Sequence, residues 1–197
     1  GEVASRMVVA AVHDMANEGQ EIDTAALKTA VLRANQQVLD AAAGNSSYEG
    51  MGSTATILHV DEHAGMAYYA HVGDSRLYLL RHGIFRQVSR DHSYVEELVA
   101  RGQLSEVEAQ HHPRKNLLLR AVGIEEHLHV DGDSFPLAAG DRLLLATDGL
   151  TNMVDDDELS SLLGGNFADV AERMVERALA GGGSDNITAI ALAYEIP

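Results

Sequence analysis

Asp141–Leu150, with the sequence DRLLLATDGL, places a carboxylate at the end of a short aliphatic run. The run follows a Gly140-Asp141 turn and predicts a buried β-strand. Asp148 would lie where that strand emerges, and burying an isolated charge costs several kcal/mol. We therefore expect Asp148 to be paired, hydrogen-bonded or bound to a cation. Gly149 lets the backbone come close to whatever Asp148 binds.

A second aspartate stands at the start of a later β-rich run. Ser184-Asp185-Asn186 leads into residues 187–194, which read as a strand. If the two strand ends are neighbours, the carboxylates of Asp148 and Asp185 would repel and the pKa of one would rise. A hard divalent cation such as Mg²⁺ or Mn²⁺ would remove that repulsion, because it prefers oxygen ligands. The alternative is that both aspartates only form turns, since Asp-Gly and Ser-Asp-Asn are common turn sequences.

The composition limits the class of protein. A chain of 197 residues is long enough for one domain with a substantial core. Cysteine is absent, so any metal ligands are oxygen or nitrogen atoms and no thiolate nucleophile exists. The net charge of −16 opposes binding to a nucleic-acid backbone. The apolar runs are shorter than a membrane span and no signal-peptide pattern opens the chain, so we expect a cytoplasmic protein without nucleic-acid or membrane partners.

Periodicity divides the chain into helical and extended segments. Four short strands joined by short turns, between residues 53 and 88, predict an antiparallel meander. A polar excursion over residues 91–120 follows, in which Ser93 and Ser105 would each cap a short helix. The other predicted elements are helices over 3–18, 24–43, 156–163 and 167–180 and strands at 127–130, 135–137 and 187–194, besides the strand that ends near Asp148.

A third acid completes a set of motifs. Asp74 lies in HVGDSR (residues 71–76), after GMGSTA (residues 50–55) and ahead of the motifs of Asp148 and Asp185. In this order and spacing, over about the whole chain, the motifs resemble the PP2C (PPM) family of metal-dependent serine/threonine protein phosphatases in its bacterial form.

The resemblance implies an α+β fold, a four-layer α-β-β-α sandwich of two antiparallel sheets flanked by helix pairs. It implies one domain over residues 1–197 with a small flap subdomain at about residues 91–120. It also implies hydrolysis of phosphoserine and phosphothreonine in proteins, opposing a bacterial Ser/Thr kinase. Phosphorylated proteins and a cognate kinase are therefore the expected partners.

Site residues carry over from the family by position. The resemblance makes Asp148 and Asp185 ligands of the first of two Mn²⁺ or Mg²⁺ ions that activate a water, and Asp74 with Asp148 the ligands of a third, weaker ion. Gly149 and Asn186 would orient these ligands. Water activated by metal needs no protein nucleophile, in agreement with the absence of cysteine. His112 and Arg114, in the flap, could contact the substrate.

The sequence departs from the family at one motif. Asp-Gly-x-Gly-Gly, which supplies the carboxylate that bridges both metals, does not occur in the chain. We expect the sequence to be truncated at its N-terminus just after that motif, and to bind metal weakly and hydrolyse phosphate poorly. The main alternative is a catalytically inactive pseudophosphatase that acts as a binding or regulatory module. A further alternative is a phosphatase of anti-anti-sigma regulators, a class related to sporulation and stress responses.

Ten histidines raise the alternative of a zinc site. His127 and His129 would share one face of the strand predicted at 127–130, at a spacing that could chelate a metal. No His-Glu-x-x-His pattern supports this hypothesis, and we expect most of the histidines to lie on the surface or in the flap.

Overall fold

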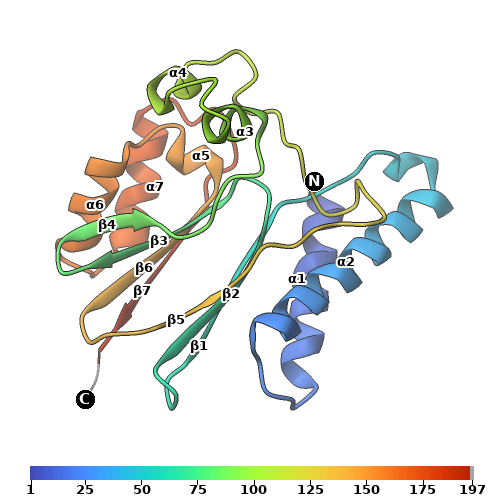
Figure 1. The fold of residues 1–197 in the computed structure, drawn as a ribbon, viewed down its shortest axis with the longest axis horizontal. Coiled ribbons are helices and arrows are strands. Elements are labelled where there is room, and N and C mark those ends of the chain that lie inside the picture. Colours follow the sequence, from blue (N-terminus) through green and yellow to red (C-terminus); the bar gives the residue numbers. More distant parts are fainter. Residues whose placement is uncertain (196–197) are drawn as a thin grey trace. The chain divides into compact units, whose positions relative to one another are not determined.

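The computed structural model describes residues 1–195, which form an α+β fold with two antiparallel sheets and seven α-helices. The chain forms two compact units (Figure 1), which are described separately below. Unit 1 comprises residues 1–74 and 91–135, and unit 2 comprises residues 75–90 and 136–197. Within the described part of the chain, no helix is long and apolar enough to cross a membrane.

Unit 1 is built from an N-terminal helix pair and a three-stranded sheet of order β1-β2-β5. β1 and β2 pair antiparallel, from Ala55 opposite Val72 to Asp61 opposite Met66. Two further short helices lie within residues 91–120, where the chain has returned to this unit. Its elements are α1 (Glu2–Asn17), α2 (Thr24–Gly44), the 3-10 helix η1 (Ser46–Tyr48), β1 (Ala55–Asp61), β2 (Met66–Val72), α3 (Tyr94–Ala100), α4 (Glu106–Gln110) and β5 (Ser134–Pro136).

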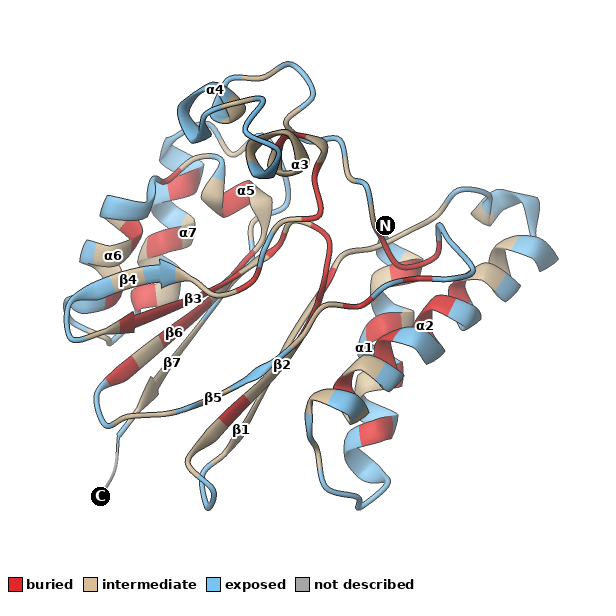
Figure 2. Ribbon diagram, in the orientation of Figure 1, coloured by how far each residue is buried: buried red, intermediate tan, exposed pale blue. Residues whose placement is uncertain are grey.

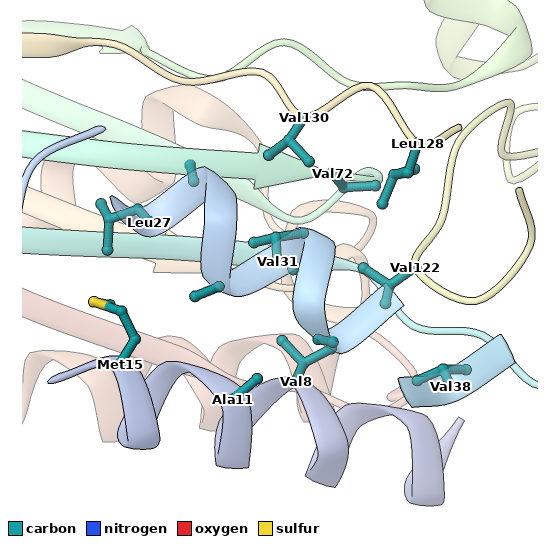
Figure 3. Close-up of a cluster of buried hydrophobic side chains, with 14 of the residues drawn as sticks. Val8, Ala11, Met15, Leu27, Val31, Val38, Val72, Val122, Leu128 and Val130 are labelled. Atoms are coloured by element: carbon teal, nitrogen blue, oxygen red, sulfur yellow. The ribbon is translucent and has the colours of Figure 1, made fainter. Parts of the chain in front are cut away.

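The core of unit 1 lies between the helix pair and the sheet. Apolar residues at helical spacing face inward from both helices, among them Val8 and Met15 of α1 and Val31 of α2 (Figure 3). Val72 of β2 and Val130 of the segment before β5 belong to the same cluster. Burial of these side chains is what holds the two helices against the strands.

Unit 2 contains a four-stranded antiparallel sheet of order β4-β3-β6-β7 and three helices. Its elements are β3 (Arg76–Arg81), β4 (Ile84–Gln87), β6 (Asp141–Ala146), α5 (Asp148–Thr151), α6 (Asp156–Gly164), α7 (Val170–Ala180) and β7 (Ala189–Tyr194). Buried and exposed residues alternate along α6 and α7 (Figure 2), and Leu159 and Met174 are among the fully buried residues that form one cluster with Leu144 of β6. An ion pair closes the end of β6 at Asp141, where both side-chain oxygens of the buried Asp141 accept from the partly exposed Arg81 at 2.8 and 2.6 Å.

Most predicted helices are confirmed, as are the expected caps Ser93 and Ser105. Asp23 accepts from the N–H of Ala26 at the start of α2, and Ser93 and Asp155 cap α3 and α6 in the same way. Ser105 begins α4 with a complete capping box. α7 starts at Val170, three residues later than predicted, because Asp169 before it adopts a left-handed conformation with φ of 56°.

Two strand predictions are wrong. The four strands between residues 53 and 88 do not form one meander, since β1 and β2 belong to one sheet and β3 and β4 to the other. β3 is buried along its length and pairs with β6 on the side opposite β4, so the strand next to it comes from far along the chain. Residues 127–130 form no strand; Leu128 and Val130 are buried in the core of unit 1 without strand pairing.

Candidate metal site and its relatives

Asp148 lies where β6 ends, as its position after an aliphatic run predicts. It is the first residue of the short helix α5, and it is half-buried. β6 pairs with β7 from Asp141 opposite Tyr194 to Ala146 opposite Ala189. The chain after β6 therefore runs beside the chain before β7, which carries Asp185.

The hydroxyl of Thr147 joins these two segments. It donates to the carbonyl of Asn186 at 3.1 Å and accepts from the N–H of Thr188 at 2.9 Å. The N–H of Thr147 also donates to the carbonyl of Thr188 at 3.1 Å. These three hydrogen bonds extend the β6–β7 pairing beyond the last paired residues and hold the backbone on either side of the two aspartates.

Gly149 allows the closest approach between the two segments. A Cβ at this position would lie 2.3 Å from the carbonyl oxygen of Asn186. That oxygen is held in place because it accepts from the hydroxyl of Thr147. The close neighbour of Gly149 in the structure is thus the backbone of Asn186, and its approach to a group bound by Asp148 stays a prediction. The N–H of Asn186 donates to the carboxylate of Asp185 at 2.7 Å.

The electrostatics of this end of unit 2 suit a cation. Burial raises the pKa of Asp148 above its ordinary value, and the negative charge of Asp185 raises it further. Backbone N–H groups and the positive charge of Arg76, on β3, act in the opposite direction. A hard divalent cation bound beside Asp148 would offset the effect of the Asp185 charge, because such cations prefer oxygen ligands.

Arg76 was not predicted as a site residue. Its guanidinium donates to the hydroxyl of Tyr78 at 3.1 Å, and that hydroxyl donates to Asp156 at 3.2 Å. The same HVGDSR motif that drew attention to Asp74 contains Arg76, so the signal was present in the sequence. No signal in the sequence indicated that β3 pairs with β6, which sets Arg76 opposite Ala146.

Asp74 lies in unit 1, at the corner that follows β2. Gly73 before it has φ of 112°, and a Cβ there would lie 2.3 Å from the Cγ2 of Thr54. The corner therefore requires glycine for two separate reasons, its backbone angle and the space available. Within residues 1–195, no group of three or more His, Asp or Glu side chains converges in a metal-binding arrangement.

Comparison with known proteins identifies the family. The family model described as protein phosphatase 2C matches residues 1–190. The chain is a member of the protein phosphatase 2C family. The serine/threonine phosphatase stp of Listeria monocytogenes is 37% identical over 198 residues, which cover 96% of this chain and 77% of that protein.

Solved structures of phosphatase 2C proteins share the fold. The crystal structure of the Mycobacterium tuberculosis serine/threonine phosphatase PstP/Ppp matches with a TM-score of 0.90 and 35% identity, over 99% of this chain and 83% of the other. The catalytic domain of the phosphatase PstP in complex with two manganese ions matches with a TM-score of 0.86 and 34% identity, over 97% of this chain and 80% of the other. Homologues of the chain are thus metal-dependent serine/threonine protein phosphatases of bacteria.

His112 and Arg114, the residues predicted to contact substrate, lie around one tyrosine in this phosphatase 2C chain. The guanidinium of Arg114 lies over the ring of Tyr94, 5.9 Å from its centre, and the ring of His112 lies 6.0 Å from it. Arg114 is exposed, and its backbone N–H donates to the Nδ1 of His112 at 3.1 Å. The structure therefore groups the two residues on the surface of unit 1, and substrate contact stays a prediction.

His127 and His129, the candidate zinc ligands, do not lie on a strand. His129 lies 3.2 Å from the carboxylate of Asp131, and residues 127–130 have no strand geometry. Asp131 also accepts from a buried histidine, His92, that sequence reasoning missed. Nothing in the local sequence Asp91-His92-Ser93 distinguishes a buried histidine from a surface one, because its partners are far along the chain.

Proposed function

We propose that this chain carries the site of a Mn²⁺- or Mg²⁺-dependent phosphatase that hydrolyses phosphoserine and phosphothreonine in proteins. Asp148 and Asp185 would be ligands of one ion, and Asp74 together with Asp148 would be ligands of a further, weaker one. The observation that supports this proposal is that the segments of Asp148 and Asp185 run side by side at one end of the β6–β7 pair, joined by Thr147, and that the charge of Asp185 acts on Asp148. The family match over residues 1–190 supports the reaction class.

The chain's own residues would have distinct tasks. Asp148 and Asp185 supply carboxylate oxygens, and the positive charge of Arg76 favours the ionised form of Asp148 that a cation needs. Gly149 and Asn186 fix the distance between the two ligand segments. Bound divalent ions supply the remaining chemistry, since they neutralise phosphoryl oxygens and lower the pKa of water. His112 and Arg114 would contact the phosphoprotein.

We also propose that residues 1–197 make a single domain, a four-layer α-β-β-α sandwich with residues 91–120 as its flap. Support comes from the family model and from the TM-score of 0.90, which both extend over residues of the two units. A single unfolding transition, seen alike by circular dichroism and by tyrosine fluorescence, is the expected result. Two separate transitions would refute it. Phosphorylated proteins and a cognate Ser/Thr kinase are the proposed partners, and a cytoplasmic location stays a prediction.

A second candidate function is that of a pseudophosphatase, a binding or regulatory module without turnover. Residues 1–197 do not contain the Asp-Gly-x-Gly-Gly motif, whose carboxylate bridges both metals in the family. The two candidates share the fold and the Asp148–Asp185 pair. They differ in whether the chain hydrolyses phosphate.

Calorimetric titration with Mn²⁺, paired with hydrolysis of a phosphothreonine peptide, separates the candidates. For a phosphatase we expect weak metal binding and slow but measurable turnover in the parent chain, and loss of both in Asp148→Asn and Asp185→Asn. Asp169→Asn is the matched control, since Asp169 lies in the same unit and its side chain makes no capping hydrogen bond to α7. Binding without turnover would favour the pseudophosphatase. Absence of Mn²⁺ binding, or binding that survives Asp148→Asn, would refute the assigned ligands.

A further inference from the structure

His92 is a buried, fully hydrogen-bonded histidine in unit 1 with no assigned role. Only 6% of its surface is exposed. Its backbone N–H donates to the carbonyl of Gly73 at 2.7 Å, and the N–H of Gly73 donates back to the Nδ1 of His92 at 3.1 Å. Two reciprocal hydrogen bonds therefore tie His92 to the residue directly before Asp74.

The hydrogen bonds of the ring assign its tautomer. Since Nδ1 of His92 accepts from Gly73, its proton must be on Nε2. Nε2 lies 3.0 Å from one carboxylate oxygen of Asp131 and donates to it. The other oxygen of Asp131 accepts from Arg120 at 3.2 Å. Every polar atom of the imidazole thus has a partner, and the ring cannot rotate or gain a proton without losing one.

The same residue joins both ends of the segment 91–120 to the sheet of unit 1. The carbonyl of His92 accepts from the N–H of Leu119 at 2.7 Å, so the two ends of the segment meet at this residue. Asp131 is itself held to β2, where its backbone N–H and carbonyl bond to His71 at 3.1 and 2.8 Å. The rings of His71 and His92 lie 4.8 Å apart.

The backbone at Gly73, which is bonded to His92, has little conformational freedom. Gly73 has φ of 112°, and the side chain of Thr54 fills the space beside it. A shift of His92 would therefore be passed to the peptide that precedes Asp74, because packed groups transmit small displacements.

We propose that His92 is a positioning residue, which sets the orientation of Asp74 and couples it to the segment 91–120. This inference rests on the proposed function, in which Asp74 is a metal ligand. His92 acts through Gly73 and touches neither metal nor substrate. Groups that orient a metal ligand in this way commonly change metal affinity by 10- to 100-fold, roughly, when they are replaced.

Two replacements of His92 separate its hydrogen bonds from its volume. His92→Phe keeps a ring beside His71 and removes the acceptor for Gly73. His92→Asn places an amide oxygen near the position of Nδ1 and restores that acceptor. The matched control is His59→Phe, since His59 of β1 also stacks on a ring, that of Tyr68 at 6.2 Å, and makes no contact with the Gly73 corner.

Amide exchange at Gly73, measured by NMR, and Mn²⁺ titration of the same samples are the readouts. In His92→Phe we expect Gly73 to exchange about tenfold faster, the factor for one lost hydrogen bond. We expect the dissociation constant of the weaker Mn²⁺ site, the one assigned to Asp74, to rise by about tenfold or more. His92→Asn should return both values to within about threefold of the parent chain, and His59→Phe should change neither.

The outcomes decide the inference separately from the proposed function. Unchanged exchange at Gly73 in His92→Phe would overturn it, and so would faster exchange with an unchanged Mn²⁺ titration. If the parent chain binds no Mn²⁺, the proposed function fails. The amide resonance of Asp74 then decides the inference: a shift in His92→Phe that His92→Asn reverses supports it, and an unshifted resonance overturns it.

Discussion

Replacing Gly149 by alanine should destabilise the chain by about 2–3 kcal/mol. The new Cβ would lie 2.3 Å from the oxygen and 2.9 Å from the carbon of the Asn186 carbonyl, so the backbone of Asn186 must retreat by about 1 Å to reach an ordinary contact. That movement strains or breaks the bonds from Thr147 to Asn186 and Thr188, each worth about 1 kcal/mol. The overpacking itself costs about 1–3 kcal/mol. The reduced freedom of the unfolded chain offsets about 0.4–1 kcal/mol of this.

Urea unfolding, followed by circular dichroism, measures this change. Gly164→Ala is the control in the same unit, since Gly164 ends α6 and its added Cβ would make an ordinary contact at 3.4 Å with Leu80. The control should be neutral or stabilised by up to about 1 kcal/mol. A Gly149→Ala chain with the same midpoint and slope as the parent would refute the reasoning, because it would mean that the two segments separate freely.

Two further substitutions test parts of the fold outside the site. Asp141→Asn should cost about 1.5–3 kcal/mol, because Asp141 is 1% exposed and the change weakens its charged hydrogen bonds with the partly exposed Arg81; Glu97→Gln, at an exposed pair with Arg101, should cost less than about 0.5 kcal/mol in the same urea experiment. The pKa of Asp141 lies below its ordinary 3.8, since bonds from Arg81 and Ala138 outweigh its burial. Its stabilisation is therefore present above pH 3.8 and lost as pH falls through the folded-state pKa, so the variant should show a shallower loss of stability in acid; an unchanged acid profile would contradict this. Asp23→Ala should lower stability by about 1 kcal/mol through loss of the cap on α2, while Asp23→Ser should restore most of it, and equal stability of all three chains would argue against the cap.

The elements that the sequence predicts best are those fixed by neighbours in the chain. A helix that starts at Asp23 or Ser105 is set by a side chain three residues from its partner, so its signal is local. β2 lies among the short strands predicted between residues 53 and 88, because a turn bounds its apolar run on each side. Both kinds of signal can be recognised without knowledge of the rest of the fold.

What the sequence does not predict depends on partners far along the chain. The turn between β2 and β3 resembles the turns inside a meander, and only the pairing of β3 with β6, some 65 residues later, sends the two strands to different sheets. Leu128 and Val130 alternate as in a strand, yet they fill the core beneath α1 and α2. The bonds of His92 to Gly73, Leu119 and Asp131 are equally distant, so a buried network at that position has no local signature.

The candidate site combines both kinds of information. Asp148 and Asp185 can each be recognised as an acid at a strand end, but their proximity depends on the register of β6 against β7. That register sets Thr147 opposite Thr188 and brings Gly149 against Asn186, so a slip of one residue would turn the side chains to the other face. The hydroxyl of Thr147 can bond to both Asn186 and Thr188 in this register alone. The residues that hold the strands in register therefore also hold the segments of Asp148 and Asp185 side by side, and we expect a change in strand pairing to alter stability together with the proposed metal binding.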